Sequence, residues 1–219
     1  HLPTLPNSLE LQRNLLATIG QQSPCIGDGG NHWLYAGLLQ AVWAKMVGEN
    51  PRELPVLVDF DLLNLHSLHI NVGLGSPEDF FGDAIPQEEK NSRSNFLSRY
   101  IATTAAFGHA VSLPDANEWG LPSTVKAYFM LQKIQESYLN SPVSKIRYHQ
   151  NGHFTSLNDA LHSGAYELGQ LQINYENQTR VYSNLGITSW EIEEADHTFL
   201  LPPGSFWASA DEGRIIAYS

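Results

Sequence analysis

The chain has 219 residues, 42% of them hydrophobic and only 16% charged, so it can bury a sizeable core in one large domain or two modest ones. Its formal net charge is −11, which argues against nucleic acid and anionic membranes as partners, because both require a basic surface. No apolar run approaches the ~18 residues of a membrane span. A neutral ligand, held by hydrogen bonds and by stacking on the plentiful aromatic residues, suits this composition better.

The first predicted element is a helix over 8–20, which has one apolar face and ends at Gly20. Residues 1–6 contain neither an initiator methionine nor the basic segment of a signal peptide. We therefore expect these 219 residues to be a piece of a longer protein. Cys25 is the only cysteine, so the sequence predicts no intrachain disulfide.

A glycine-rich loop over 21–31 carries the first candidate site residue. Asp28 lies between two glycines, which allow sharp turns and the close approach of a ligand. A predicted helix over 32–47 follows, with apolar residues every four positions. Its first turn holds three candidate ligand-binding residues, His32, Trp33 and Tyr35. An ordinary capped turn explains the same stretch, and that alternative stays open.

Two predicted strands come next. The strand over 54–61 is continuously apolar, as expected of a parallel strand covered on both faces, and it ends in Asp59 and Asp61. The strand over 68–75 carries Asn71 near its carboxyl end. Ligands of parallel sheets bind at the carboxyl ends of strands, so these three residues are candidates for a site. An aspartate in this position can also simply cap the next turn.

Helices are predicted over 91–107 and 122–138, with a short strand or turn over 108–113 between them. His109, Glu118 and Trp119 lie in this connection and can contact a polar ligand. Strands and helices alternating at these lengths predict an α/β arrangement with a parallel sheet over residues 1–142.

The pattern changes near residue 142. Turn residues such as Asn151-Gly152 and Glu176-Asn177 separate short strands, which predicts a small antiparallel β domain over 143–219. The sequon that begins at Asn177 is better explained as a hairpin turn. The predicted strands cover 145–149, 165–175, 179–184, 189–192, 198–201 and 214–218.

Three groups of motifs resemble the C-terminal part of a barrel glycoside hydrolase, of the kind found in uncharacterised bacterial relatives of endo-α-N-acetylgalactosaminidase-type enzymes. They are GDG at 27–29 with HWLYAG at 32–37, PVLVDFDL at 55–62 with NVGLG at 71–75, and VYSN at 181–184 with Trp190 and LLPPGSF at 200–206. The resemblance implies α/β followed by all-β architecture. Residues 1–142 would be the last strand–helix units of a (β/α) barrel, and residues 143–219 an antiparallel β-sandwich.

The resemblance further implies a fragment of a carbohydrate-active enzyme that cleaves an oligosaccharide or polysaccharide with paired carboxyl groups. Asp28 is the expected acid/base and Asp59 and Asp61 are the next catalytic candidates, while a second carboxylate is expected upstream of residue 1. The piece alone is expected to be inactive, and the full-length protein to be secreted or periplasmic. The expected sugar-binding residues are His32, Trp33, Tyr35, Asn71, His109, Glu118 and Trp119.

Two other classes of function remain open. One is a carbohydrate-binding or scaffold protein that keeps the fold without a working carboxylate pair. The other is a metal-dependent α/β enzyme using Asp59 and Asp61 with His66 and His69. Because the histidine pair has no obvious third ligand, we expect hydrogen-bonded histidines and neither metal nor cofactor. The sequence predicts no oligomeric state.

Overall fold

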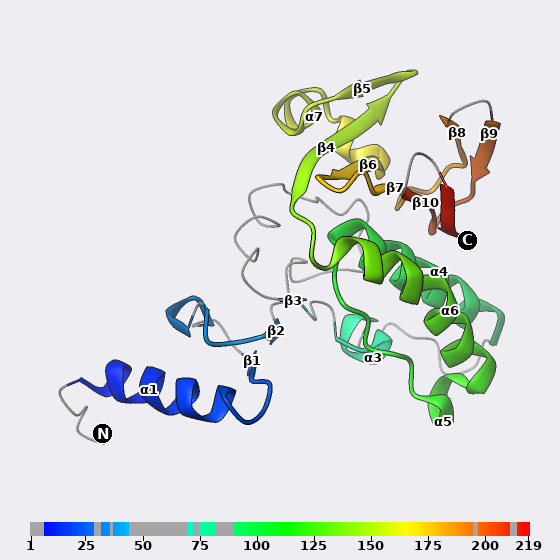
Figure 1. The fold of residues 1–219 in the computed structure, drawn as a ribbon. Coiled ribbons are helices and arrows are strands. Elements are labelled where there is room, and N and C mark those ends of the chain that lie inside the picture. Colours follow the sequence, from blue (N-terminus) through cyan, green and yellow to red (C-terminus); the bar gives the residue numbers. More distant parts are fainter. Residues whose placement is uncertain are drawn as a thin grey trace.

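The computed structural model describes residues 7–28, 32–35, 37–43, 70–71, 75–81, 90–194, 197–210 and 214–219. The described chain combines helices with three sheets: a three-stranded parallel sheet, a six-stranded antiparallel sheet and a two-stranded antiparallel hairpin (Figure 1). The predicted mixture of helices with strands is therefore present. Within the described ranges, no helix is both long and apolar enough to cross a membrane.

The N-terminal part contains the parallel sheet. Its strands β1, β2 and β3 lie side by side in sequence order, with Ile26 paired to Ala41 and Ala41 paired to Ile70. Helix α1 precedes them, and the 3-10 helix η1 lies between β1 and β2 (Figure 1). The bounds are α1 Ser8–Gly20, β1 Ile26–Asp28, η1 His32–Tyr35, β2 Ala41–Trp43 and β3 Ile70–Asn71.

The predicted helix over 32–47 is wrong where the structure describes it. Only His32–Tyr35 is helical, as a single 3-10 turn, and Ala41–Trp43 is a strand. Gly37 breaks the helix because it has a φ of 79°, and the Gln40 side chain accepts a hydrogen bond from the Cys25 backbone N–H at 2.6 Å. Pairing of β2 with β1 and β3 therefore outweighs the helical spacing of the apolar residues. The predicted strand over 54–61 lies outside the described residues.

The middle of the chain is helical. Helices α4 and α6 match the predictions over 91–107 and 122–138 to within one residue and lie side by side (Figure 1). The short helix α5 begins after Asp115, whose carboxylate accepts the Asn117 backbone N–H at 2.9 Å. The bounds are α3 Pro77–Phe81, α4 Lys90–Phe107, α5 Ala116–Trp119 and α6 Leu121–Tyr138.

The segment between α4 and α5 runs beside α6 in the opposite direction. The His109 carbonyl accepts from Tyr138 Oη at 2.6 Å, and the Pro114 carbonyl accepts from Thr124 Oγ1 at 2.9 Å. Thr124 and Tyr138 are about 21 Å apart along the helix axis, and the chain from His109 to Pro114 reaches at most about 18 Å. The two hydroxyl-bearing side chains supply the difference, and the segment itself must be nearly extended. The segment is therefore extended, although it pairs with no strand among the described residues.

The C-terminal part forms a six-stranded antiparallel sheet in the order β11-β10-β7-β6-β4-β5, and a hairpin of β8 and β9. The predicted strands are largely confirmed, except that residues 165–168 form a 3-10 helix. Strands β5 and β10 and the short helix α7 were not predicted. The strand bounds are β4 Val143–Gln150, β5 His153–Thr155, β6 Gln170–Tyr175, β7 Arg180–Asn184, β8 Trp190–Glu194, β9 His197–Leu201, β10 Ser205–Ala210 and β11 Arg214–Tyr218. The helices between β5 and β6 are α7 Leu157–Ser163 and η3 Ala165–Leu168.

One face of the six-stranded sheet packs against α4 and α6 (Figure 1). Because side chains alternate along a strand, every second residue enters this core, and each large one contributes about 1.5–3 kcal/mol. The buried sheet residues are Ile146, Tyr148, Leu171, Ile173, Tyr175, Val181, Phe206, Ala208 and Ala217. The core unites helices before residue 142 with strands after it, and the domain boundary at 142 stays a prediction.

Gly108 ends α4 where the helix meets this core. It has a φ of 65°, and a Cβ at this position would lie 2.5 Å from Tyr175 Oη. Only glycine combines that backbone conformation with so close an approach. The tyrosine ring stacks on Tyr138 of α6 with centroids 5.6 Å apart. Gly108 thus lets α4 turn directly over the sheet.

The opposite face of the sheet is partly covered by the β8–β9 hairpin, through a second apolar cluster. This cluster contains Tyr182, Trp190, Ile192, Leu201 and Trp207, with Phe199 at its margin. Buried Asn184, the last residue of β7, joins the layers: its Nδ2 donates to the carbonyls of Thr188 and Leu201, both at 2.8 Å. One amide therefore satisfies two backbone acceptors at the end of the hairpin where Trp190 pairs with Leu201.

We expect Asn184→Asp to destabilise the protein by at least about 2 kcal/mol, because it places an unpaired charge against two carbonyl oxygens. Urea unfolding at pH 7 measures the change. Asn158→Asp is the matched control, since the same change on the exposed α7 should stay within about 0.5 kcal/mol of wild type. Equal stabilities of the two variants would contradict this role of Asn184.

Candidate functional site

The carboxyl edge of the parallel sheet holds two of the predicted site residues. Asp28 is the last residue of β1 and Asn71 the last of β3, while β2 lies between them. Asp28 pairs with Trp43, and Asn71 pairs with Val42, so both lie at the same edge. Two strand spacings separate their Cα atoms by about 10 Å. Sequence positions 43 residues apart are thus brought to one edge of one sheet.

The 3-10 helix η1 follows this edge and carries three more predicted residues. Tyr35 is half-buried and its hydroxyl donates to Gln12 of α1, while Arg13 of α1 donates to the Leu34 carbonyl. Helix α1 therefore holds η1 by hydrogen bonds shortly after β1 ends. The backbones of His32 and Trp33 share η1. The side chains of Asp28, His32, Trp33 and Asn71, and the whole of Asp59, Asp61, His66 and His69, lie outside the described part.

The three remaining candidates flank the extended segment before α6. His109 begins it and is 1% exposed, with its ring stacked on Phe107 at 5.3 Å between centroids. Glu118 and Trp119 follow it in α5, where Glu118 is exposed and Trp119 packs against the main core. Of the three, Glu118 is therefore the one with an exposed side chain. No described contact joins any of them to Asp28 or Asn71.

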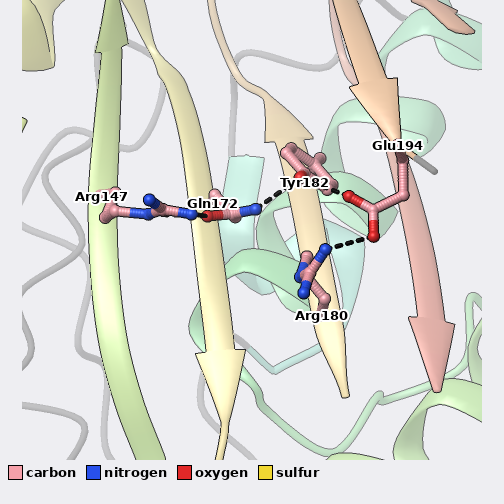
Figure 2. A network of polar contacts seen from close by, with 5 residues as sticks. All are labelled: Arg147, Gln172, Arg180, Tyr182 and Glu194. Atoms are coloured by element: carbon pink, nitrogen blue, oxygen red, sulfur yellow. Dashed lines mark hydrogen bonds and ion pairs between the residues drawn. The ribbon is translucent and has the colours of Figure 1, made fainter. Parts of the chain in front are cut away.

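A polar network, not predicted from the sequence, crosses the face of the antiparallel sheet that the β8–β9 hairpin partly covers (Figure 2). Arg147 Nε donates to Gln172 Oε1 at 2.8 Å, and Gln172 Nε2 donates to the Tyr182 hydroxyl. Tyr182 donates in turn to Glu194 Oε2 at 2.7 Å, and Arg180 pairs with Glu194 Oε1. The network runs from β4 through β6 and β7 to β8, and ties the hairpin to the sheet.

Both oxygens of Glu194 are occupied in this network, so its carboxylate has a structural part. Its side chain is 10% exposed, whereas that of Arg180 is 41% exposed. The hydrogen bond to Glu194 raises the pKa of Arg180. Burial, reinforced by the hydrogen bond to Glu194, raises the pKa of Tyr182 to about 12. The network therefore keeps a neutral phenol and a charged pair together beside the second apolar cluster.

Aromatic side chains surround one end of this network. His149 stacks on Trp190 with centroids 5.2 Å apart, and its Nδ1 lies 2.9 Å from Gln170 Oε1. The Arg147 guanidinium lies 4.7 Å from the centre of the Phe154 ring. The period-two alternation of polar residues in β4, β6 and β7 signals this second face. The sequence alone does not show which hairpin residue completes it.

The described residues contain no group of three histidine, cysteine, aspartate or glutamate side chains close enough together to hold a metal ion. Cys25 is buried beside Leu39 and packs against Leu16 and Tyr35. These contacts make it a small apolar filler.

Comparison with known proteins found no family model that matches this chain and no curated protein that is significantly similar to it.

We expect Glu194→Gln to lower the free energy of unfolding by about 1–3 kcal/mol. The amide has no charge to form an ion pair with Arg180, and its NH2 group faces a donor, either Arg180 or the Tyr182 hydroxyl. The neighbouring Glu193 is exposed, and Glu193→Gln should change stability by less than about 0.5 kcal/mol. Chemical unfolding of both variants measures the difference. A cost shared equally by the two would show that the charge, rather than the network, matters.

Alkaline pH should test the buried phenol. An unfolded tyrosine ionises near pH 10, whereas Tyr182 in the fold has a pKa of about 12. As pH rises, the tyrosine of the unfolded state therefore loses its proton first. The contribution of Tyr182 to the free energy of unfolding then falls as pH rises from about 10 to 12. The Tyr182→Phe variant lacks this contribution. Its free energy of unfolding, measured by urea titration at each pH, should therefore fall less steeply than that of wild type between about pH 10 and 12. Identical slopes for variant and wild type would contradict the assignment.

Proposed function

We propose that this chain belongs to a carbohydrate-active glycoside hydrolase. The observation that carries the proposal is the placement of Asp28 and Asn71 at the carboxyl edge of a parallel sheet whose strands follow sequence order. Ligand sites of parallel sheets lie at this edge, where a carboxylate and an amide can bind sugar hydroxyls. The acidic, aromatic-rich composition supports a neutral glycan over a polyanion.

The arrangement of the elements supports a (β/α) barrel as the architecture of the first 142 residues. Neighbouring strands of a barrel follow one another in sequence, whereas an open doubly wound sheet reverses its order. The order β1-β2-β3 agrees with a barrel, and one half of a doubly wound sheet has the same order. The extended segment 109–114 followed by the antiparallel helix α6 also resembles one strand–helix unit.

The packing of the C-terminal part supports a β-sandwich after the barrel. The hairpin of β8 and β9 lies over the six-stranded sheet through Tyr182, Trp190 and Trp207. In this proposal the hairpin is the second layer of the sandwich, held by Asn184 and by the network to Glu194. The C-terminal part would stabilise the barrel, because the face of the six-stranded sheet opposite the hairpin shares a core with α4 and α6.

The proposed reaction uses two carboxyl groups on opposite sides of the scissile bond. Asp28 is proposed as the acid/base, donating a proton to the leaving oxygen. The second carboxylate is proposed to come from Asp59 or Asp61, or from a strand upstream of residue 1. A separation of ~5–5.5 Å between the two would give retention, and ~6.5–9.5 Å inversion. His32, Trp33, Tyr35 and Asn71 are proposed to contact the sugar.

A non-catalytic carbohydrate-binding protein is the second candidate. It is favoured by one observation: Asp28 is the one acidic residue among the described residues of the parallel strands. The two candidates differ in product formation. A panel of oligosaccharides incubated with the full-length protein should give cleavage products in the first case, and binding without cleavage in the second.

We expect Asp28→Asn in the full-length protein to lower turnover by ~100-fold or more while glycan binding changes little, since removal of the acid/base affects the transition state most. Reducing-sugar release and calorimetric binding measure the two effects. Asp159→Asn, on the exposed α7, is the matched control and should keep wild-type turnover. Full turnover of the Asp28 variant would remove Asp28 from the mechanism.

A further inference from the structure

Helix α6 carries an exposed apolar stripe on the side that faces away from the core. The opposite side packs into the main core through Ala127, Leu131, Ile134 and Tyr138. The exposed residues recur at the i, i+4, i+7 and i+8 positions of one helix face: Leu121, Val125, Tyr128 and Phe129. Leu121 and Phe129 are each 65% exposed. Both sides of α6 are therefore apolar, although the core covers one of them.

Two contacts fix and enlarge this stripe. The rings of Tyr128 and Phe129 meet edge to face, with centroids 5.3 Å apart. Leu113 is also exposed and lies next to α6, because the carbonyl of the following residue, Pro114, accepts from Thr124 Oγ1 of α6 at 2.9 Å. A surface arranged in advance in this way loses little conformational freedom when a partner covers it.

The area of the stripe reaches the lower limit for a specific interface. A full aromatic side chain offers about 150–250 Å² and an aliphatic one somewhat less, so the exposed parts of the stripe and Leu113 amount to roughly 500 Å². A monomer rarely exposes a larger contiguous apolar patch. Two such patches in contact remove about 1,000 Å² from water, which is what a specific protein–protein interface needs.

The spacing of the stripe makes it complementary to itself. Val125 lies midway between Leu121 and Phe129, four residues from each. If two α6 helices cross antiparallel with Val125 on the two-fold axis, Leu121 of each copy meets Phe129 of the other. Rows of residues spaced by four interlock in this way in the commonest class of helix packing. A two-fold contact of this kind closes at two copies.

The charges around the stripe permit this contact, although each chain carries a net charge of −11. Helix α6 contains two lysines and one glutamate, so its own net charge is close to zero. Lys133 is paired with Glu136 at 2.7 Å, and Lys126 donates to Ser98 of α4 at 3.1 Å. Acidic groups farther than about 8 Å from the contact are screened at physiological ionic strength.

We propose that the α6 stripe is the contact surface of a two-fold symmetric dimer, with a second copy of the chain as its occupant. The self-complementary spacing and the nearly neutral helix favour a second copy over an unlike partner. None of the stripe residues is a candidate site residue, so the dimer is independent of the proposed reaction.

Sedimentation equilibrium of the full-length polypeptide tests the association. The average mass should rise from one copy toward two between ~1 μM and ~1 mM, a range suited to an interface of this size. Phe129→Glu should weaken association at least ~100-fold, because each new charge would face an apolar side chain. Leu15→Glu adds the same charge at a 60% exposed position of α1 and should associate like wild type. A wild type that stays one copy at ~1 mM, or a Phe129→Glu variant that associates like wild type, would overturn the inference.

Cysteine cross-linking tests the register of the two helices. Val125→Cys should give a disulfide-linked dimer on mild oxidation, because the two-fold axis brings both copies of this position face to face. Leu121→Cys is the matched control, since its two copies lie more than ~10 Å apart and a disulfide spans at most ~7 Å between Cα atoms. Wild type gives the background, because its Cys25 is buried. Equal linking of the two variants, or linking of neither, contradicts the proposed dimer.

Discussion

The six-stranded antiparallel sheet imposes the constraint on which the described fold depends, because its side chains point alternately to two faces and both need cover. One face is largely apolar and packs on α4 and α6, and its buried Ser183 donates to the Ala102 carbonyl of α4. The other carries aromatic and polar residues and is covered in part by the β8–β9 hairpin. The two helices and the hairpin are therefore positioned by the same period of two along the strands.

The polar network on the second face follows from that partial cover. Gln172 and Tyr182 are almost fully buried, and buried polar groups need partners. Arg147 and Glu194 supply them from the two sides, and Arg180 balances the charge of Glu194. A network with every member bonded specifies one position of the hairpin, whereas apolar contacts alone would tolerate sliding.

The parallel sheet obeys a different constraint, because parallel strands are normally covered on both faces and joined through helices. This places Asp28 and Asn71 at a common edge.

The sequence by itself determined the elements whose local signals agree with their environment. Helices α4 and α6 were predicted to within one residue, since their apolar spacing matches the core they face, and strand β11 was predicted at its observed bounds. The turn at Asn151-Gly152 was also recognised correctly, and both of its residues have a positive φ. Only the tertiary structure decided the rest. Strand β2 replaces a predicted helix because pairing with β1 and β3 outweighs helix propensity. Strand β10 was missed because Ser205, Ala208 and Ser209 have little intrinsic strand preference, and burial in the sheet favours them there. Likewise, no local pattern predicts the hydrogen bond between Tyr182 and Glu194, or the position of Asn71 at the same sheet edge as Asp28. Both arise only between strands that folding brings together.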